Sequence, residues 1–175
     1  MVSVVFSSLE PALNIRRAVP EDAPGIVAVL AEVVNERVHS AIDCVWSVDQ
    51  ERAYLESLSA REAVHVAVDA AERIVGMQIL DRWSAMLDSM AHVGQVGTFV
   101  MPVWRGQGVG RELWKATAAF AHEAQYQKLV VQVRASNAHA KSFYRGLGFA
   151  ECGRLARQVI IDGRHDDEIL MELLL

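Results

Sequence analysis

The chain has 175 residues, 52% of them hydrophobic and 22% charged, and a chain of this size buries roughly 70% of the surface that its unfolded form exposes. This composition excludes an intrinsically disordered, low-complexity or collagen-like protein. Its 17 basic and 22 acidic side chains give a formal net charge of −5, which argues against binding nucleic acid by neutralising many phosphates. We therefore expect a single domain over residues 1–175, with no nucleic-acid partner.

The cysteines and the termini give no sign of an extracellular or membrane protein. Cys44 and Cys152 lie far apart and in no CxxC arrangement, so neither a disulfide framework nor a zinc site is expected. Residues 1–6 lack the basic region of a signal peptide, and no apolar run approaches the roughly 20 residues that a membrane span requires. His122-Glu123 lacks the second histidine of a metalloprotease. We expect a cytoplasmic protein with no membrane partner and no catalytic metal.

The first half of the chain has alternating strand and helix patterns. Pro20 and the two acids after it suit the start of a helix. Apolar residues at helical spacing follow, and later β-rich runs separated by a polar stretch predict a hairpin. The expected elements are a strand from residue 14, a helix from 20 to about 35, a loop at 41–47, a helix at 48–58, and strands at 63–68 and 74–80.

The second half contains one β-α-β unit and ends in two further strands. The expected elements are an irregular connection at 81–91, a strand at 92–100, a helix at 108–125, a strand at 128–134, a helix at 138–145, and strands at about 149–161 and 166–174. Because strands arrive first as a hairpin and then through a helical crossover, we expect an α/β (α+β) fold. It has one mixed, mostly antiparallel twisted sheet with helices on both faces.

The stretch VMPVWRGQGVGR joins the end of an expected strand to the start of an expected helix. Free N–H groups at a helix N-terminus form an anion site if side chains do not block it, and Gly106, Gly108 and Gly110 remove those side chains. Arg105 and Arg111 add positive charge, which suits a pyrophosphate. The alternative is that these glycines only build a tight turn.

Two other phosphate motifs do not fit this stretch. A P-loop needs GxxxxGK followed by Ser or Thr, which the chain lacks. The dinucleotide fingerprint needs a third small residue where Leu113 stands and an acid at the end of the next strand, which ends at Arg134. The sequence therefore disfavours a dinucleotide-dependent oxidoreductase.

Two motifs resemble those of the GNAT superfamily of N-acetyltransferases. One is the R-x-x-G-x-G segment that starts at Arg105, and the other is the N-x-x-A-x-x-x-Y-x-x-x-G-F segment from Asn137 to Phe149. The resemblance covers most of residues 14–175, with a motif core at about 92–149. The central strand, the second motif and the tail hairpin are most similar to the phosphinothricin acetyltransferase branch.

The resemblance implies an acetyl-CoA site between two strands that splay apart, those near 92–100 and 128–134. Backbone groups of Phe99, Val100 and Met101 would pair with the pantetheine arm. The implied pyrophosphate site consists of the backbone of Arg105, Gly106, Gln107, Gly108, Val109, Gly110 and Arg111, and Asn137 and Ser142 are expected to reach the cofactor from the second motif.

The resemblance also implies a catalytic role for Tyr144. A phenol near the thioester sulfur could protonate the leaving thiolate or stabilise its charge. The alternative is that Tyr144 is a core aromatic residue beside Phe143 and Phe149. We expect the catalytic role.

The matching proton acceptor is less clear, because Gln95 stands where many family members carry a glutamate and it cannot take a proton. Gln95 could still orient a water molecule, and His92 is a nearby titratable alternative. Glu32 and Glu36 lie one helical turn apart and could line the acceptor side, although a solvated helix face also explains them.

The acceptor pocket has no motif of its own. Trp46 and Trp83 fall in irregular connections and could form its wall, although core packing is the default for all four tryptophans. The apolar ending at 169–175 is compatible with a homodimer contact or with a buried central strand. Our hypothesis is direct acetyl transfer from acetyl-CoA to a primary amine of a small molecule or a protein N-terminus. A non-catalytic acyl-CoA-binding regulatory module is the alternative.

Overall fold

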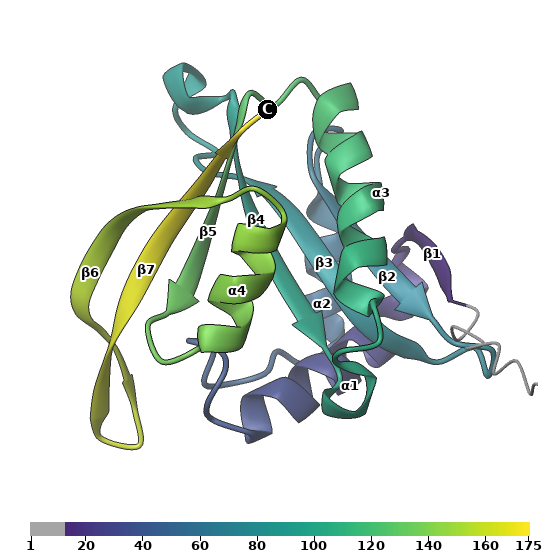
Figure 1. Ribbon diagram of the computed structural model, residues 1–175. Helices are drawn as coiled ribbons and strands as arrows, with labels where there is room; N and C mark the ends of the chain where they lie inside the picture. Colours follow the sequence, from purple (N-terminus) through teal and green to yellow (C-terminus); the bar gives the residue numbers. More distant parts are fainter. Residues whose placement is uncertain (1–12) are drawn as a thin grey trace, which may run out of the picture.

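One twisted sheet of seven strands organises the computed structural model, which describes residues 13–175 (Figure 1). The strands are β1 (Asn14–Arg17), β2 (Ala63–Val68), β3 (Ile74–Arg82), β4 (Val93–Val100), β5 (Lys128–Arg134), β6 (Ala150–Ile161) and β7 (Arg164–Leu174). Their order across the sheet is β1-β2-β3-β4-β5-β7-β6, and among these described strands only the β4–β5 pair is parallel. The predicted mixed, mostly antiparallel sheet is confirmed. Residues 1–6, on which the signal-peptide prediction rests, lie outside the described residues.

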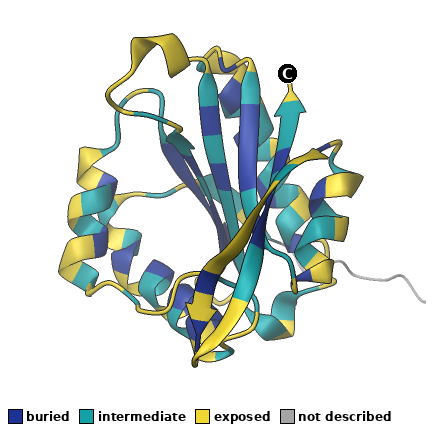
Figure 2. Ribbon diagram, turned by 90° about the vertical axis from the view of Figure 1, so that its left-hand side faces the viewer, coloured by how far each residue is buried: buried dark blue, intermediate teal, exposed yellow. Residues whose placement is uncertain are grey.

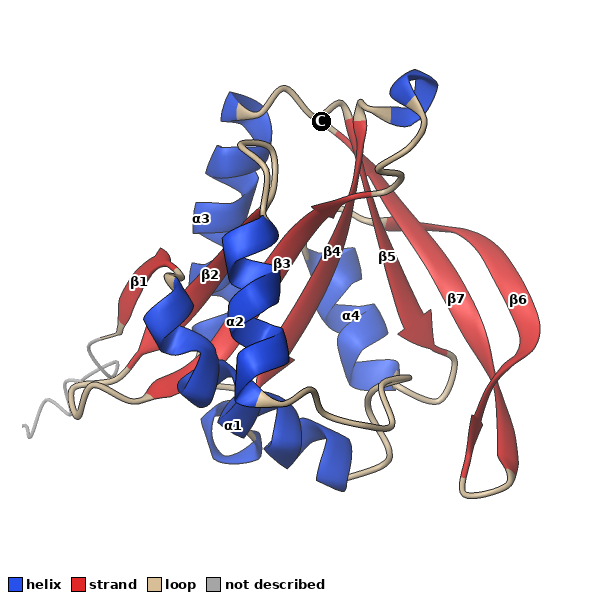
Figure 3. Cartoon of the chain, turned by 180° about the vertical axis from the view of Figure 1, so that it is seen from behind, coloured by secondary structure: helices blue, strands red, loops and turns tan. Residues whose placement is uncertain are grey.

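Within residues 13–175 four α-helices cover both faces of the sheet, as predicted. They are α1 (Ala23–Asn35), α2 (Val48–Ser57), α3 (Val109–Glu123) and α4 (Ala138–Gly146). Figure 1 shows α3 and α4 in front of the sheet, and Figure 3, seen from behind, shows α1 and α2 over β2 and β3. In the same view β5 and β7 have no helix in front of them. None of the helices within residues 13–175 has the length and apolarity for a membrane crossing.

The core lies on both sides of the sheet because β2 and β3 are buried on both faces. Val64 and Val66 of β2 pack with α1 and α2, whereas Ala67 packs with α3. A third cluster joins β5 and β7 to α3 and α4 around Leu129 and Met171, both fully buried. Figure 2 shows the buried central strands and, in contrast, the exposed length of β6 at the sheet edge. The helices are therefore anchored, and they hold the loops at the ends of the strands in place.

The sheet opens between β4 and β5. The two strands pair only over Val93–Gln95 and Lys128–Val130, and then they separate. β4 stays paired with β3 up to Val100, while β5 stays paired with β7 up to Arg134. Each strand thus follows its antiparallel neighbour away from the other. The fork that the resemblance implied is confirmed.

The connection between α1 and α2 runs below the open end of the fork. Arg134 Nη1, at the end of β5, donates to the carbonyl oxygens of Arg37 and Ser40 at 3.1 and 3.3 Å. The Arg37 guanidinium pairs with Asp162 at the tip of the β6–β7 hairpin, with Nε 2.8 Å from Oδ2. These contacts tie three distant parts of the chain together beside the fork.

Candidate active site

A cleft of about 700 Å³ lies at the fork. All predicted site residues except Met101 and Gln107 line it: Phe99, Val100, Arg105, Gly106, Gly108, Val109, Gly110, Arg111, Asn137, Ser142 and Tyr144. Residues that the sequence did not single out also line it, among them Thr98 of β4 and His39 and Ser40 of the α1–α2 connection. The structure therefore brings both sequence motifs to one cleft.

The loop before α3 has the geometry of an anion site. Gly106 and Gly108 have φ of +74° and +83°, a region that favours glycine, and a Cβ at either position would meet no atom within 4 Å. The N–H groups of residues 106–110 donate to no backbone carbonyl within residues 13–175. Free amides at the positive end of a 15-residue helix attract an anion. The space above the two glycines is open to receive one.

Arg105 braces this loop through its side chain. Its Nη1 and Nη2 lie 2.9 and 2.5 Å from the two carboxylate oxygens of Glu36, and its Nε donates to Val100 O at 3.1 Å. The hydrogen bond from Arg105 holds the pKa of Glu36 below its ordinary value. The guanidinium therefore has a protein anion as its partner, and Glu36 is not a freely solvated side chain. Arg111, exposed at the cleft, is the cation left to face a ligand.

Tyr144 is packed in the core, and its side chain also lines the cleft. Its side chain is 5% exposed and packs edge-on against Phe143 and Phe149, at ring distances of 5.1 and 5.4 Å. Its hydroxyl reaches the cleft and donates to Thr98 Oγ1 at 2.9 Å. Burial raises the pKa of Tyr144 to about 12, so the phenol is protonated at neutral pH. Buried Gln78 donates to the same Thr98 oxygen at 2.7 Å.

The direction of the β4 backbone corrects part of the predicted pantetheine contact. Met101 N–H donates to Val75 O at 3.0 Å, and Val93 O accepts from Trp83 N–H on the same side, so odd-numbered residues of β4 point toward β3. Because successive residues point to opposite sides, the backbone of Phe99 also faces β3. The prediction is therefore wrong for the backbone of Met101 and Phe99. Thr98 and Val100 are the residues whose backbone groups face the fork.

The side chains of Asn137 and Gln107 hydrogen-bond to other groups of the protein. Asn137 Oδ1 accepts from Ala140 N–H at 2.9 Å, which caps α4, and its Nδ2 donates to His39 O at 2.9 Å. Gln107 Nε2 donates to Val103 O at 2.6 Å. Both amides therefore stabilise the loops that surround the cleft.

Gln95 belongs to a row of polar side chains that the sequence did not reveal. Its Nε2 donates to Gln132 Oε1 of β5 at 2.8 Å, and Gln132 Nε2 donates to Glu168 Oε2 of β7 at 3.1 Å. Glu168 is 8% exposed, and burial raises its pKa. The polar residues Gln95 and Gln132 between apolar neighbours in their strands were the available signal, but nothing in the sequence shows which partners they have.

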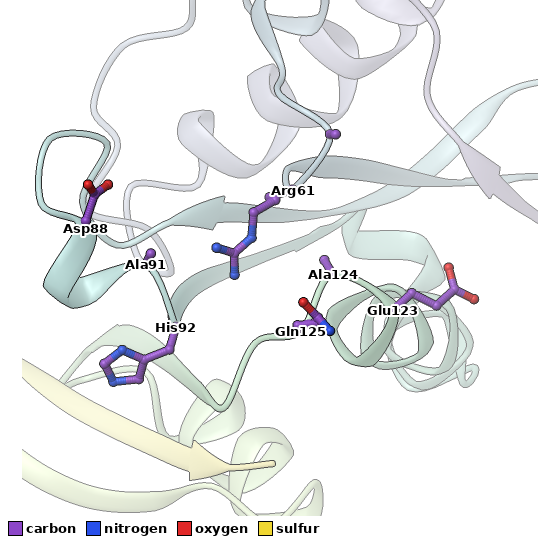
Figure 4. A pocket seen from close by; sticks show the side chains of 8 residues that line it. Arg61, Asp88, Ala91, His92, Glu123, Ala124 and Gln125 are labelled. Carbon is purple, nitrogen blue, oxygen red and sulfur yellow. The ribbon is translucent and has the colours of Figure 1, made fainter.

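His92 lies in a different cavity, of about 530 Å³, near the start of β4 (Figure 4). Arg61 and Asp88 line this cavity, together with the end of α3 at Glu123 and Gln125. The cleft with Tyr144 lies at the other end of β4, so His92 does not share it.

Glu32 is exposed and lines neither cavity. Over residues 13–175 no three His, Cys, Asp or Glu side chains form a candidate metal site.

Two of the four tryptophans depart from core packing. Trp46 and Trp83 are 49% and 38% exposed, whereas Trp114 packs against Phe149 and Trp104 lines the cleft. The Trp46 ring lies 5.7 Å from that of Tyr54 in α2. The two exposed tryptophans therefore place partly exposed aromatic surface near α2.

Comparisons with known proteins agree with this geometry. A family model described as an acetyltransferase (GNAT) domain matches residues 30–161. A Stenotrophomonas maltophilia aminoglycoside N(6')-acetyltransferase type 1 is 36% identical over 59 residues, which span 34% of this chain and only 39% of that relative.

Solved structures have the same fold. A Sinorhizobium meliloti phosphinothricin acetyltransferase in complex with acetyl-CoA superposes with a TM-score of 0.86 at 18% identity, covering 93% of this chain and 88% of that one. A Brucella melitensis ribosomal-protein-alanine N-acetyltransferase gives 0.85 at 24% identity, covering 93% and 99%.

Proposed function

The chain belongs to the GNAT acetyltransferase family, and from that premise we propose that it transfers an acetyl group from acetyl-CoA directly to a primary amine of a small molecule or a protein N-terminus. The observation that carries this proposal is the meeting of a free-amide helix start and the Tyr144 hydroxyl in one cleft. Acetyl-CoA supplies the activated thioester. The chain's own residues bind it, orient it and stabilise the charge that develops.

The anion loop would hold the pyrophosphate. The amides of residues 106–110 and the exposed side chain of Arg111 supply the donors and the charge. The Glu36–Arg105 ion pair fixes the loop to the end of α1. Within the fork, the backbone groups of Thr98 and Val100 face the gap that the pantetheine arm would fill. Val100 O already accepts from Arg105, so Thr98 would supply most of that contact.

Tyr144 would stabilise the thiolate that leaves when the amine attacks. A thiol titrates near 8.5 in its ordinary state, whereas Tyr144 has a pKa of about 12. Because the phenol is the weaker acid, it stabilises the sulfur by donating a hydrogen bond and keeps its own proton. The carbon–sulfur bond breaks as the carbon–nitrogen bond forms, CoA leaves as a thiolate, and the proton that the amine loses passes to solvent water. Thr98 can then turn its own hydrogen toward the Tyr144 oxygen, since Gln78 still donates to Thr98.

The names of the relatives support an amine acceptor without choosing one. An aminoglycoside, phosphinothricin and the alanine of a ribosomal protein are different molecules. The homodimer contact through the C-terminal strands stays a prediction.

A thiol-release assay tests the proposed function. The protein is incubated with acetyl-CoA and, separately, with phosphinothricin, kanamycin, or a peptide that begins with alanine, and CoA is titrated into the same protein by calorimetry. Release of CoA that depends on one amine supports acetyl transfer. CoA binding without release on a broad amine panel would favour the regulatory module, and absence of CoA binding would contradict both.

A further inference from the structure

Gln95, Gln132 and Glu168 form a diagonal row across three neighbouring strands. Gln95 is the last β4 residue that pairs with β5, so it stands at the point where the fork opens. Gln132 follows Val130, the β5 partner of Gln95, by two residues. Glu168 precedes Leu170, the β7 partner of Gln132, by two residues. Because β7 runs antiparallel to β5, both steps lead toward the same end of the sheet. The row therefore runs from the base of the fork toward its open end.

The carboxylate at one end determines how both amides are oriented. An ionised carboxylate can only accept hydrogen bonds, so Gln132 must present its NH₂ group to Glu168. Its carbonyl oxygen then faces Gln95, which must present its own NH₂ group in turn. Gln95 Oε1 is consequently the free end of the row. This oxygen accepts no hydrogen bond within residues 13–175. It is also not one of the fully buried side-chain oxygen and nitrogen atoms that lack a partner, so it is in contact with solvent.

This free oxygen lies on the side from which an acceptor amine can approach. Side chains alternate along a strand, and Phe99, four residues after Gln95, packs against the α1–α2 core. Gln95 therefore shares the face opposite to Tyr144, whose helix covers the other side of the fork. Figure 3 shows that no helix covers β5 and β7 on this face. The side chains of Gln95, Gln132 and Glu168 lie on this face.

We propose that Glu168 is a positioning residue for acetyl transfer, which acts through Gln132 to hold the Gln95 carbonyl oxygen toward the acceptor amine. The inference rests on the proposed function. The amide of Gln95 thereby replaces an acid as the amine's hydrogen-bond acceptor. The nearest carboxylate on β3 is that of Asp81, the register partner of Gln95, and it accepts from the Tyr54 hydroxyl at 2.7 Å.

The charged groups around Glu168 have partners of their own. Arg134, its direct neighbour on β5, pairs with Asp166 at 2.9 Å. On β6, Arg154 lies one residue before Leu155, the neighbour of Glu168, and pairs with Asp167. Arg134 also donates to the carbonyl oxygens of Arg37 and Ser40 in the α1–α2 connection. Gln132 is therefore the group that Glu168 orients.

The test is a pair of variants measured with the amine that the wild type acetylates fastest among phosphinothricin, kanamycin and the alanyl peptide. In Glu168→Gln an amide can both donate and accept, so the hydrogen bonds of the row can run in either direction and Gln95 can present its NH₂ group instead of its oxygen. The KM for the amine should therefore rise about tenfold, while the affinity for CoA stays unchanged. Gln95→Glu/Glu168→Gln reverses every hydrogen bond in the row and again places an acceptor oxygen at the fork. This double variant should recover most of the lost amine affinity.

Glu172→Gln is the matched control. Glu172 lies on the same face of β7, but it pairs with Lys128 and not with the row, so its amine KM should match the wild type. An unchanged amine KM in Glu168→Gln, or a double variant no better than the single one, would overturn the inference. A wild type that acetylates none of these amines would instead contradict the proposed function.

A second measurement needs no substrate. In ¹⁵N spectra of the whole protein, Glu168→Gln should shift the side-chain NH₂ signals of both Gln95 and Gln132, whereas Glu172→Gln should leave them in place. A Gln95 signal that stays unchanged in Glu168→Gln would show that the carboxylate does not orient this amide, and the inference would fail.

Discussion

The two sides of the fork are built in different ways. The donor side, between α3 and α4, relies on backbone amides, two glycines with positive φ and one tyrosine. The opposite side, which is the proposed acceptor side, relies on side chains from β3, β4, β5, β7 and α2 that hydrogen-bond to one another. A backbone site can be encoded in a short continuous segment, whereas a side-chain network is assembled by the fold. Changes on one side should therefore leave binding on the other side intact.

The largest effect is expected from Tyr144→Phe. Removing the hydroxyl keeps the packed ring but deletes the donor to the leaving sulfur, so kcat should fall about 100-fold, with little change in the dissociation constant of CoA. Steady-state kinetics and calorimetry measure the two quantities. Tyr126→Phe removes another buried hydroxyl, which donates to Arg61 O away from the cleft, and it should leave kcat unchanged. Equal kcat values in both variants would exclude Tyr144 from the chemistry.

Gly108→Ala should weaken CoA binding about tenfold, because a methyl group over the free amides costs hydrogen bonds to a charged ligand. It should also destabilise the fold by about 1–2 kcal/mol, since Gly108 has a left-handed φ. Gly163→Ala separates the two effects. Gly163 has a similar φ of +73° in the β6–β7 turn, so it should show the strain alone. Equal CoA affinities in the two variants would contradict the anion site.

The Glu36–Arg105 ion pair predicts a pH dependence of stability. Because the folded pKa of Glu36 is lowered, its contribution is fully present above the ordinary value of 4.5 and is lost as pH falls through the lower, folded pKa. Glu36→Gln should remove about 1 kcal/mol at pH 7 and flatten the acid limb of urea-denaturation curves. The exposed Glu112–Lys115 pair serves as control, and Glu112→Gln should change neither. An acid limb that stays as steep in Glu36→Gln would contradict this role.

A loss of stability of similar size, with no effect on CoA binding, is expected on the proposed acceptor side from Tyr54→Phe. The Tyr54 hydroxyl donates to Asp81 Oδ1 at 2.7 Å, and burial already raises the pKa of that carboxyl. Losing this bond should cost about 1 kcal/mol of unfolding free energy. The affinity for CoA should stay the same in calorimetry. A severalfold loss of CoA affinity would show that the two sides of the fork are not separate.

The sequence predicts the regular elements because their patterns are local. The alternation of β2 and the helical spacing of α3 require no knowledge of distant residues, and the glycines of the anion loop follow one another in the chain. Even the strand that carries Gln95 could be placed correctly.

The failures of prediction all involve partners that are distant in the sequence or depend on exact register. The sequence predicts that Arg105 is free to bind a ligand, whereas in the structure it pairs with Glu36, 69 positions away. Which backbone groups of β4 face the fork depends on the pairing of Met101 with Val75, which composition does not reveal. The orientation of Gln95 depends on a carboxylate two strands away. Such features are properties of the folded sheet.

The most direct test of the central claim is a titration of CoA followed through the backbone amide signals of the ¹⁵N-labelled protein. The account predicts that the amides of Gly106 and Gly108 shift most, together with Thr98 at the fork, while the cavity around His92 is unaffected. Shifts confined to the surroundings of His92, or none in the loop before α3, would contradict the placement of the donor in the fork.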